Sequence, residues 1–315
     1  DIKILQLSLR SADLCIESGT LDLSLKILER AAVRVERLEI FSGDDDVPIG
    51  RTLSAKYYML RTLLAWHQTR PDLAEHMLCM IPEEAINNDL QLASELADLC
   101  YNVGQQAFSK GQFDLAAKWL EKAAKHNSRS LNAGDENSPN VKLRLIILHM
   151  TVRAYLEQNS GESRTKSLQT LEILISYYPN ELAVLILWLE VMMKQGNPDH
   201  RIFYNRLETL VHVIELTDTN IKIILSYIQK LQEWSIEMCV RTLEQLLLRM
   251  PVLSDNEQWI DRLFVISIRL STSSGVADSL SLLDAVATHL YDYLMKPLSQ
   301  TTANASLIVR LGINP

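Results

Sequence analysis

Cys100-Tyr-Asn-Val-Gly-Gln-Gln-Ala-Phe-Ser-Lys-Gly-Gln-Phe-Asp-Leu-Ala-Ala-Lys-Trp-Leu-Glu-Lys-Ala123 is the stretch that decides the fold, because its small and bulky residues recur at the spacing of two packed helices. Val103 and Gly104 fall where the first helix must let its partner approach closely, and Gly111 then ends that helix. The second helix carries a buried stripe at helical spacing, formed by Phe113, Ala116, Leu120 and Ala123. The stretch therefore predicts a helix pair.

The same offsets occur earlier in the chain, so the pattern is an internal repeat. Gly19 ends a first helix there, and the helix that follows carries, at the offsets of the later stripe, Leu21, Ser24, Leu28 and Ala31. Helix pairs that repeat in this way are typical of tetratricopeptide (TPR) arrays, whose nominal period is about 34 residues. Several anchors are spaced more widely than that, so we expect lengthened and irregular repeats.

Helical periodicity continues along the whole chain, and no run of alternating apolar and polar residues bounded by turn signals interrupts it. We therefore expect an all-α fold, a right-handed α-α superhelix or TPR-like solenoid of about seven helix pairs, forming a single domain over residues 1–315. Beyond the first and third pairs, further pairs are expected at residues 52–80, 141–178, 181–216, 219–250 and 254–295.

The segments between these pairs have polar or turn-forming composition. This composition predicts flexible loops at residues 42–50 and 126–140. A helical lead-in to the third pair is expected around residues 89–98. Residues 296–315 begin another apolar run and are expected to be a truncated continuation or a capping segment. Because the chain begins with Asp1 rather than Met, we expect it to be a fragment of a longer protein.

Composition favours a packed helical chain with protein partners. The hydrophobic content of 47% is ample for a continuous core, and only 10 Gly and 9 Pro argue against disorder. A net charge of -8 disfavours direct nucleic-acid binding, which needs clustered Lys and Arg. The longest nearly apolar run, residues 182–193, is interrupted by Glu190 and is too short to span a membrane, so we expect no membrane insertion and an intracellular location.

No enzymatic, cofactor or metal motif stands out, and the chain is predicted to be non-catalytic. His67 and His76 form the closest histidine pair but lack carboxylates at ligand spacing, and the consecutive residues 44–46 (Asp-Asp-Asp) do not alternate as a calcium loop does. The glycine-rich phosphate loops and the GxSxG nucleophile motif are also missing. The four cysteines, which lie far apart in apolar patterns, are expected to be reduced and buried: Cys15, Cys79, Cys100 and Cys239.

Two candidate partner-binding features lie in or beside the deciding stretch. Lys118, Lys122 and Lys125 share one face of the second helix; the first interpretation is a solvated outer face, with an acidic protein partner second and DNA third. Asn102 occupies the TPR position that hydrogen-bonds a peptide carboxylate in chaperone-binding modules, although the basic residues that would complete such a clamp are not recognisable nearby.

Five tryptophans are distributed roughly one to a pair. Core packing explains them best, while rigid aromatic side chains lining a groove would instead act as anchors for a bound segment. They are Trp66, Trp119, Trp188, Trp234 and Trp259.

Leu99-Cys-Tyr-Asn-Val-Gly followed by Phe113-Asp-Leu-Ala-Ala-Lys-Trp-Leu-Glu-Lys-Ala resembles the meiosis-specific sporulation family of the ZIP-four type, whose mammalian relative is a testis-expressed TPR protein. The resemblance implies a nuclear, chromosome-associated, non-enzymatic scaffold. It would promote crossover formation and synapsis by holding other meiotic recombination proteins on chromosomes. No partner-binding residues are implied by it.

Two alternatives to the meiotic scaffold remain from the residues alone. A peptide-sensing TPR regulatory module or chaperone-type adaptor predicts a polar groove with convergent Arg, Asn and Lys side chains, whereas a scaffold predicts an apolar or acidic groove. Direct contact with DNA predicts binding that weakens steeply with salt.

Overall fold

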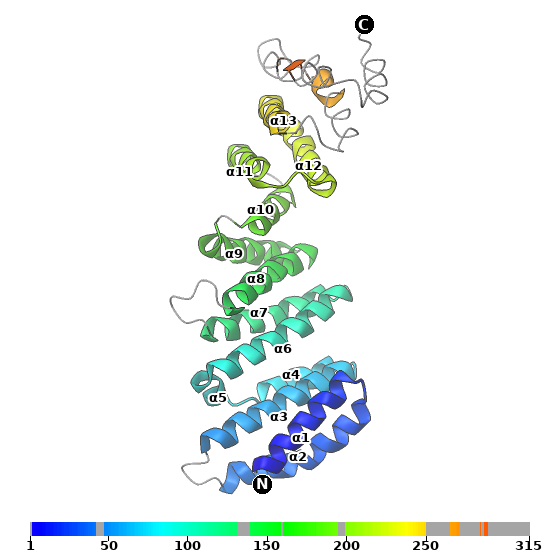
Figure 1. The fold of residues 1–315 in the computed structure, drawn as a ribbon, viewed down its shortest axis with the longest axis vertical. Coiled ribbons are helices and arrows are strands. Elements are labelled where there is room, and N and C mark those ends of the chain that lie inside the picture. The colour runs from blue at the N-terminus through cyan, green and yellow to red at the C-terminus, as the bar shows by residue number, and fades with distance from the viewer. Residues whose placement is uncertain are drawn as a thin grey trace, which may run out of the picture. The chain divides into compact units, whose positions relative to one another are not determined.

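The computed structural model describes residues 2–41, 47–130, 139–158, 160–179, 181–194, 199–249, 265–270, 284 and 287–288. All regular secondary structure within these residues is α-helical, as Figure 1 shows, and the predicted all-α class is confirmed. The chain divides into two compact units, residues 1–177 and 178–315, each of which is described by itself. A single domain over the whole chain therefore stays a prediction.

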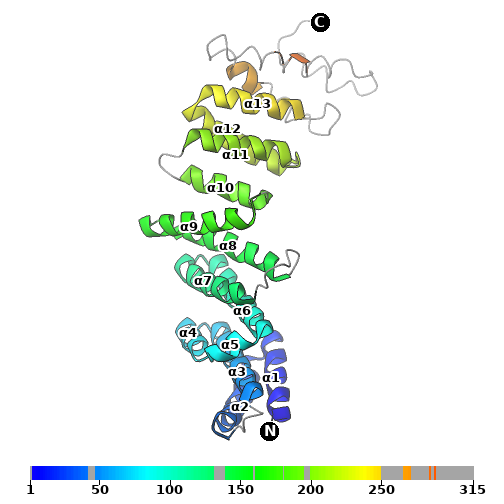
Figure 2. The ribbon, with the colours of Figure 1, turned by 90° about the vertical axis from the view of Figure 1, so that its left-hand side faces the viewer.

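The first unit contains nine helices within its described residues. They are α1 (Ile2–Glu17), α2 (Leu21–Phe41), α3 (Val47–His67), α4 (Pro71–Cys79), α5 (Glu83–Asn88), α6 (Leu90–Ser109), α7 (Phe113–Ser130), α8 (Pro139–Gln158) and α9 (Gly161–Tyr177). Helices adjacent in sequence pack as pairs, α1 with α2, α3 with α4, α6 with α7 and α8 with α9 (Figure 2). The pairs in turn touch one another through α2 with α3 and α7 with α8.

Three of these pairs are joined by the same tight turn, in which one residue has a positive φ. This residue is Gly19 (φ 76°), Thr69 (φ 60°) or Gly111 (φ 72°). In each turn its N–H bonds back to a carbonyl three residues earlier, and the next N–H bonds five residues back, as Gln112 N does to Ala107 O at 3.0 Å. This arrangement is the Schellman motif, for which glycine is the favoured residue. Thr69 is the exception.

The core of the first unit consists of two apolar clusters, because each helix buries one face against its neighbours. One cluster lies among α1, α2 and α3 and includes Leu5, Leu28, Val35 and Leu64. The other extends from α3 to α8 and includes Trp66, Leu96, Trp119, Leu120 and Ile147.

The second unit is built from α10 (Leu182–Lys194), α11 (His200–Val213), α12 (Asp218–Trp234) and α13 (Ile236–Arg249), with a further described helical stretch at residues 265–270. Asp199 and Thr217 cap the N-termini of α11 and α12 with their side-chain oxygens. At the other end of α11, Arg249 donates to the carbonyls of Val211 and Ile214, the latter at 3.1 Å. The core of this unit includes Phe203, Leu207, Ile224, Leu243 and Leu246.

Several predicted boundaries are wrong. Residues 47–50 belong to α3 and residues 126–130 to α7, although their composition predicts loops; α8 likewise begins at Pro139, inside the second predicted loop. The reason is that turn-forming and polar residues also occur at helix ends, as Gly50 does in α3 and Asn127 does in α7, so composition alone does not separate a helix end from a loop. The expected lead-in at residues 89–98 is the first half of α6, and α5 precedes it. The predicted pair at 254–295 lies largely outside the described residues, as do residues 42–46, 131–138 and 296–315.

Candidate functional site

The deciding helix pair, α6 with α7, is closely packed. Gly104 lies so near α7 that a Cβ on it would be 2.8 Å from Leu120 Cγ and 3.4 Å from the carbonyl oxygen of Ala116. Val103 and Ala123 are also buried, but Phe113 is only half-buried and contacts the edge of the Phe108 ring, with centroids 5.2 Å apart. These residues serve packing, so a binding surface must lie elsewhere on the unit.

The candidate for such a surface is a groove of about 1610 Å³ on the first unit, lined by α1, α3, α5 and α6. The helices α1, α3 and α6 are the first members of three successive pairs. Each presents side chains three or four residues apart, because that spacing brings them to one helix face. The lining includes Gln6, Arg10 and Asp13 of α1, Thr52, Lys56 and Leu60 of α3, and Gln91, Glu95, Asp98 and Asn102 of α6.

Two ion pairs connect the helices along this groove. Arg51 of α3 lies 2.6 Å from Glu84 of α5, and Lys56 of α3 lies 3.2 Å from Glu95 of α6, measured between side-chain nitrogen and oxygen atoms. Both pairs are solvent-accessible, so each contributes at most about 1 kcal/mol to stability. The other charged groups of the lining are the cations Lys3 and Arg10 and the carboxylates Asp13, Asp89 and Asp98, of which Asp89 caps the N-terminus of α6.

The Glu95 carboxylate influences both Asp13 and Asp98. Burial raises the pKa of Asp13, and the charges of Glu17 and Glu95 raise it further against the opposing effect of Lys56. Burial also raises the pKa of Asp98, and Glu95 adds to that rise. Glu95 therefore acts on both aspartates, and Lys56 is the one cation among the groups that shift the pKa of Asp13. This part of the groove is acidic and would be stabilised by a positively charged side chain.

Apolar side chains lie nearer the N-terminal ends of the same helices. Leu7 of α1 is 63% exposed, Ile49 of α3 is 46% exposed and Leu90 of α6 is 45% exposed, although each lines the groove. Lys3 of α1 also belongs to the lining there, and Arg10 lies three residues after Leu7 and three residues before Asp13. The groove thus offers exposed apolar side chains together with an acidic region, a combination suited to a protein segment with apolar and basic residues.

The predicted partner-binding residues lie in different settings. Asn102 is exposed and lines the groove on the face of α6 that carries Asp98 and Glu95. The carboxylates of Asp98 and Glu95 would repel a peptide carboxylate bound at Asn102, so the surroundings of Asn102 do not favour a chaperone-type clamp. Lys122 and Lys125 pair with Glu75 of α4 at 3.6 Å and with Glu83 of α5 at 3.9 Å.

Lys122 therefore connects α7 to α4 of the preceding pair and Lys125 connects α7 to α5, while Lys118 is exposed. The Nζ atom of Lys122 also lies 4.9 Å from the centroid of the Trp119 ring. Their use as a partner-binding face stays a prediction.

The tryptophans of the first unit belong to the core. Trp66 and Trp119 are buried with ring centroids 6.2 Å apart, and Trp66 Nε1 donates to Gln106 Oε1 at 2.7 Å. In the second unit Trp188 and Trp234 are half-buried beside Phe203, and Trp259 lies outside the described residues. None of the described tryptophans lines the groove, so its anchoring side chains are aliphatic.

The cysteines do not share one environment. Burial raises the pKa of the Cys100 and Cys239 thiols to about 12, which makes them unreactive. Cys15 is half-buried and Cys79 is exposed, so the prediction that all four are buried is wrong for Cys79, which lies at the end of α4. His67 and His76 are exposed, and among the described residues no group of His, Cys, Asp and Glu is arranged to hold a metal ion.

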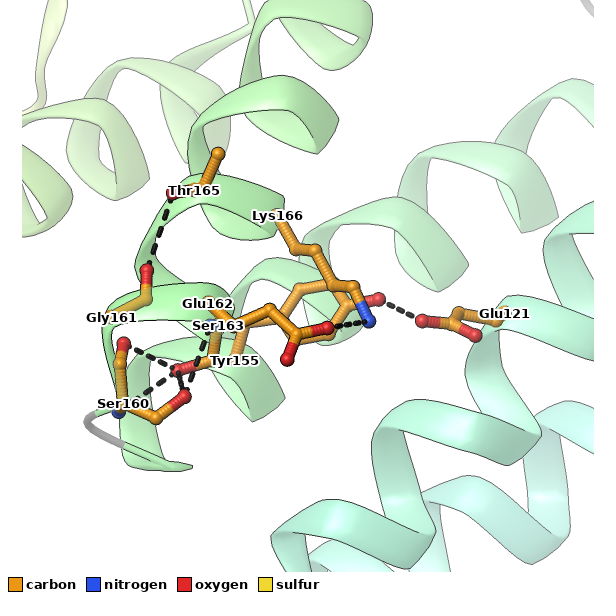
Figure 3. Close-up of polar contacts among 8 residues, drawn as sticks. All are labelled: Glu121, Tyr155, Ser160, Gly161, Glu162, Ser163, Thr165 and Lys166. Carbon is orange, nitrogen blue, oxygen red and sulfur yellow. Dashed lines mark hydrogen bonds and ion pairs between the residues drawn. The ribbon is translucent and has the colours of Figure 1, made fainter.

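Sequence reasoning missed a polar cluster where α7, α8 and α9 meet. In Figure 3 the Tyr155 hydroxyl of α8 donates to the Glu121 carboxylate of α7, and Glu162 pairs with Lys166 one turn along α9 at 3.0 Å. Ser160 and Ser163 bond to each other reciprocally and cap the start of α9. The spacing Ser160-x-x-Ser163 was the available signal. The Tyr155–Glu121 hydrogen bond joins α8 to α7, and the other contacts stabilise the start of α9.

A solved structure and a protein family show similarity to this chain. The structure, from a functional characterization of Pseudomonas aeruginosa pilF, is 10% identical, with 98% of each chain covered and a TM-score of 0.34, which is too low to indicate a shared fold. No curated protein matches the chain. Within the described residues no helix is both long and apolar enough to cross a membrane.

A family model described as "Meiosis protein SPO22/ZIP4 like" matches residues 64–309, which is most of the chain. The chain therefore belongs to the SPO22/ZIP4-like family of meiosis proteins.

Proposed function

We propose that this protein is a non-catalytic scaffold that holds meiotic recombination and synapsis proteins together on chromosomes and so promotes crossover formation. Membership of a meiosis family and a fold built from stacked helix pairs support this role. Stacked pairs leave their first helices open along one side, which is how such folds bind other proteins. A nuclear location follows from the same proposal.

The groove on α1, α3, α5 and α6 is the observation that carries the proposal. A cavity of about 1610 Å³ that combines exposed apolar side chains with an acidic region accommodates a segment of another protein. We assign its apolar contacts to Leu7, Ile49 and Leu90, and its contact with a basic side chain to Asp13, Glu95 and Asp98. The segment is therefore expected to carry a Lys or Arg next to apolar residues.

The alternative of a chaperone-type or peptide-sensing adaptor receives less support from this groove. Such an adaptor needs cations around Asn102 to bind a peptide carboxylate, whereas Glu95 and Asp98 lie on the same helix face. Lys56 is already paired with Glu95 at 3.2 Å.

Affinity capture of the full-length protein from meiotic and from vegetative cells, followed by mass spectrometry, tests the scaffold role. Recombination and synapsis proteins should be recovered from meiotic cells only. Recovery of chaperones or transcription factors from both kinds of cell would instead support the adaptor.

A further inference from the structure

A second surface of the first unit lies on α2, outside the groove. Four basic residues occur there at successive turns: Lys26, Arg30, Arg34 and Arg37. Their spacing of four, four and three residues keeps them on one helix face over about 16 Å of axis. The opposite face of α2 is the packed one, where Leu28, Ala31 and Val35 are buried. The basic stripe, as we call these four residues, therefore points away from the core.

The described carboxylates near the stripe do not pair with its charges. In the described part of the chain none of the four forms an ion pair, and Arg34 Nη1 instead donates to the carbonyl of Arg30 at 3.1 Å. The carboxylates Asp22, Glu29 and Glu36 follow a separate line on α2. Glu29 and Glu36 act on Tyr57 of α3, so that line lies on the α3 side of the helix.

Two apolar side chains lie within the same sector. Leu23 is 52% exposed and Val33 is 50% exposed, and helical spacing places both among the four cations. A phosphate backbone gains nothing from contact with Leu or Val, whereas an acidic amphipathic helix matches both the cations and the apolar residues. The chain's net charge of -8 also disfavours long-range attraction of nucleic acid.

We infer that the basic stripe with Leu23 and Val33 is a docking surface for an acidic amphipathic helix of a partner protein. No residue of α2 lines the groove, so a partner on α2 and a partner in the groove can be bound together. The two surfaces have opposite charge preferences, because the groove contains an acidic region at Asp13, Glu95 and Asp98 whereas α2 carries the basic stripe. The stripe lies before residue 64, where the family match begins.

Binding of a designed probe to the full-length protein tests this inference. The probe is a labelled helical peptide with Glu at successive turns and Leu between them, measured by fluorescence anisotropy. Arg30→Glu/Arg37→Glu should weaken its binding at least about tenfold, because two attractive contacts become repulsive. The matched control Lys142→Glu/Arg201→Glu changes the charge equally at exposed positions and should leave binding unchanged.

Two further arms distinguish the occupant. Leu23→Ser/Val33→Ser should weaken peptide binding, since the apolar contacts belong to the proposed interface. A short DNA duplex and vesicles containing phosphatidylserine should bind more weakly than the peptide. The inference would be overturned if DNA or vesicles bound more tightly than the peptide and lost this binding in Arg30→Glu/Arg37→Glu. It would also be overturned if the wild type did not bind the peptide, or if Arg30→Glu/Arg37→Glu bound it as well as the control variant does. Circular dichroism confirms that each variant is folded.

Discussion

Gly104 of α6 lies directly against Leu120 of α7, with room for no additional carbon, since a Cβ there would be 2.8 Å from Leu120 Cγ. Leu120 is fully buried and cannot move into solvent. Gly104→Val should therefore lower the free energy of unfolding by about 3 kcal/mol through overpacking. Chemical denaturation measures this loss.

Two companion variants identify the cause of that loss. The double variant Gly104→Val/Leu120→Ala should lose less unfolding free energy than the two single variants lose in sum, because the smaller alanine side chain on α7 makes room for the added valine. Gly161→Ala, where no atom lies within 4 Å of the added carbon, should change stability by less than about 0.5 kcal/mol. Equal losses at Gly104 and Gly161 would contradict a close contact between α6 and α7.

Thr69 is predicted to be a site of stabilisation. It occupies the turn position that Gly19 and Gly111 hold in two other pairs, and its φ of 60° is unfavourable for a residue with a side chain. Thr69→Gly should raise the free energy of unfolding by about 0.5 to 1 kcal/mol, after allowance for the added freedom of glycine when unfolded. Gly111→Thr should have the opposite effect. A lower melting temperature for Thr69→Gly would show that the turn does not hold residue 69 in this conformation.

The raised pKa of Asp98, a residue of the groove, predicts that the stability of the protein depends on pH. Its folded-state pKa is raised above 3.8, chiefly by burial and further by Glu95. The folded chain therefore binds this proton more tightly than the unfolded chain, so the ionised Asp98 carboxylate destabilises the folded state. This destabilisation reaches its full size above the folded-state pKa. It disappears as the pH falls through the folded pKa towards the unfolded value. Asp98→Asn should accordingly stabilise the protein at neutral pH and have no such effect below about pH 3.8.

Denaturation of Asp98→Asn and the wild type at a series of pH values checks this sign. Glu172→Gln, at an exposed position on α9, is the control for loss of a carboxylate. A stabilisation by Asp98→Asn that grows on acidification would refute the proposed destabilisation by the Asp98 charge.

Tyr155 connects two helix pairs through its hydroxyl group. It donates to Glu121 across the α7–α8 interface, and its pKa is raised by burial and by that hydrogen bond. Tyr155→Phe should lower the free energy of unfolding by about 1 kcal/mol, because the ring stays packed while the hydrogen bond is lost. In a Glu121→Ala background the same change should cost much less. Equal costs in both backgrounds, measured by a double-mutant cycle, would rule out the contribution of this bond.

Sequence alone predicts the helix pairs where local signals are strong. Gly104 and Ala116 are small for a reason that spacing reveals, namely the close approach of two consecutive helices. The short helix α5 is not predicted, because Pro82 signals the end of a helix, although the chain resumes a helix directly after it. Polar residues near a helix end look like loop residues, yet Asn127 of α7 is fully buried and its side-chain amide donates to the Asn140 carbonyl at 3.1 Å, a contact that only packing creates.

The candidate site is much harder to predict from the sequence than the helix pairs are. Lys122 looks like part of a free basic face, yet it pairs with Glu75 of α4, a residue distant in sequence. The groove joins Asp13, Lys56 and Glu95 from three different pairs, and only packing brings these residues together. Asn102 is identified by its repeat position, but the carboxylates around it change what that position favours.

The central claim is that the groove binds meiotic protein partners, and reversal of its acidic charge tests it most directly. Asp13→Arg/Asp98→Arg places two cations where a basic partner residue is expected, while Asp114→Arg/Glu172→Arg makes the same change in charge at exposed sites outside the groove. The measurement is quantitative capture of recombination and synapsis proteins with the full-length variants from meiotic cells, after their melting temperatures are shown to match. We expect the groove variant to lose these proteins at least about tenfold and the control to retain them. Equal recovery with both variants would contradict the claim.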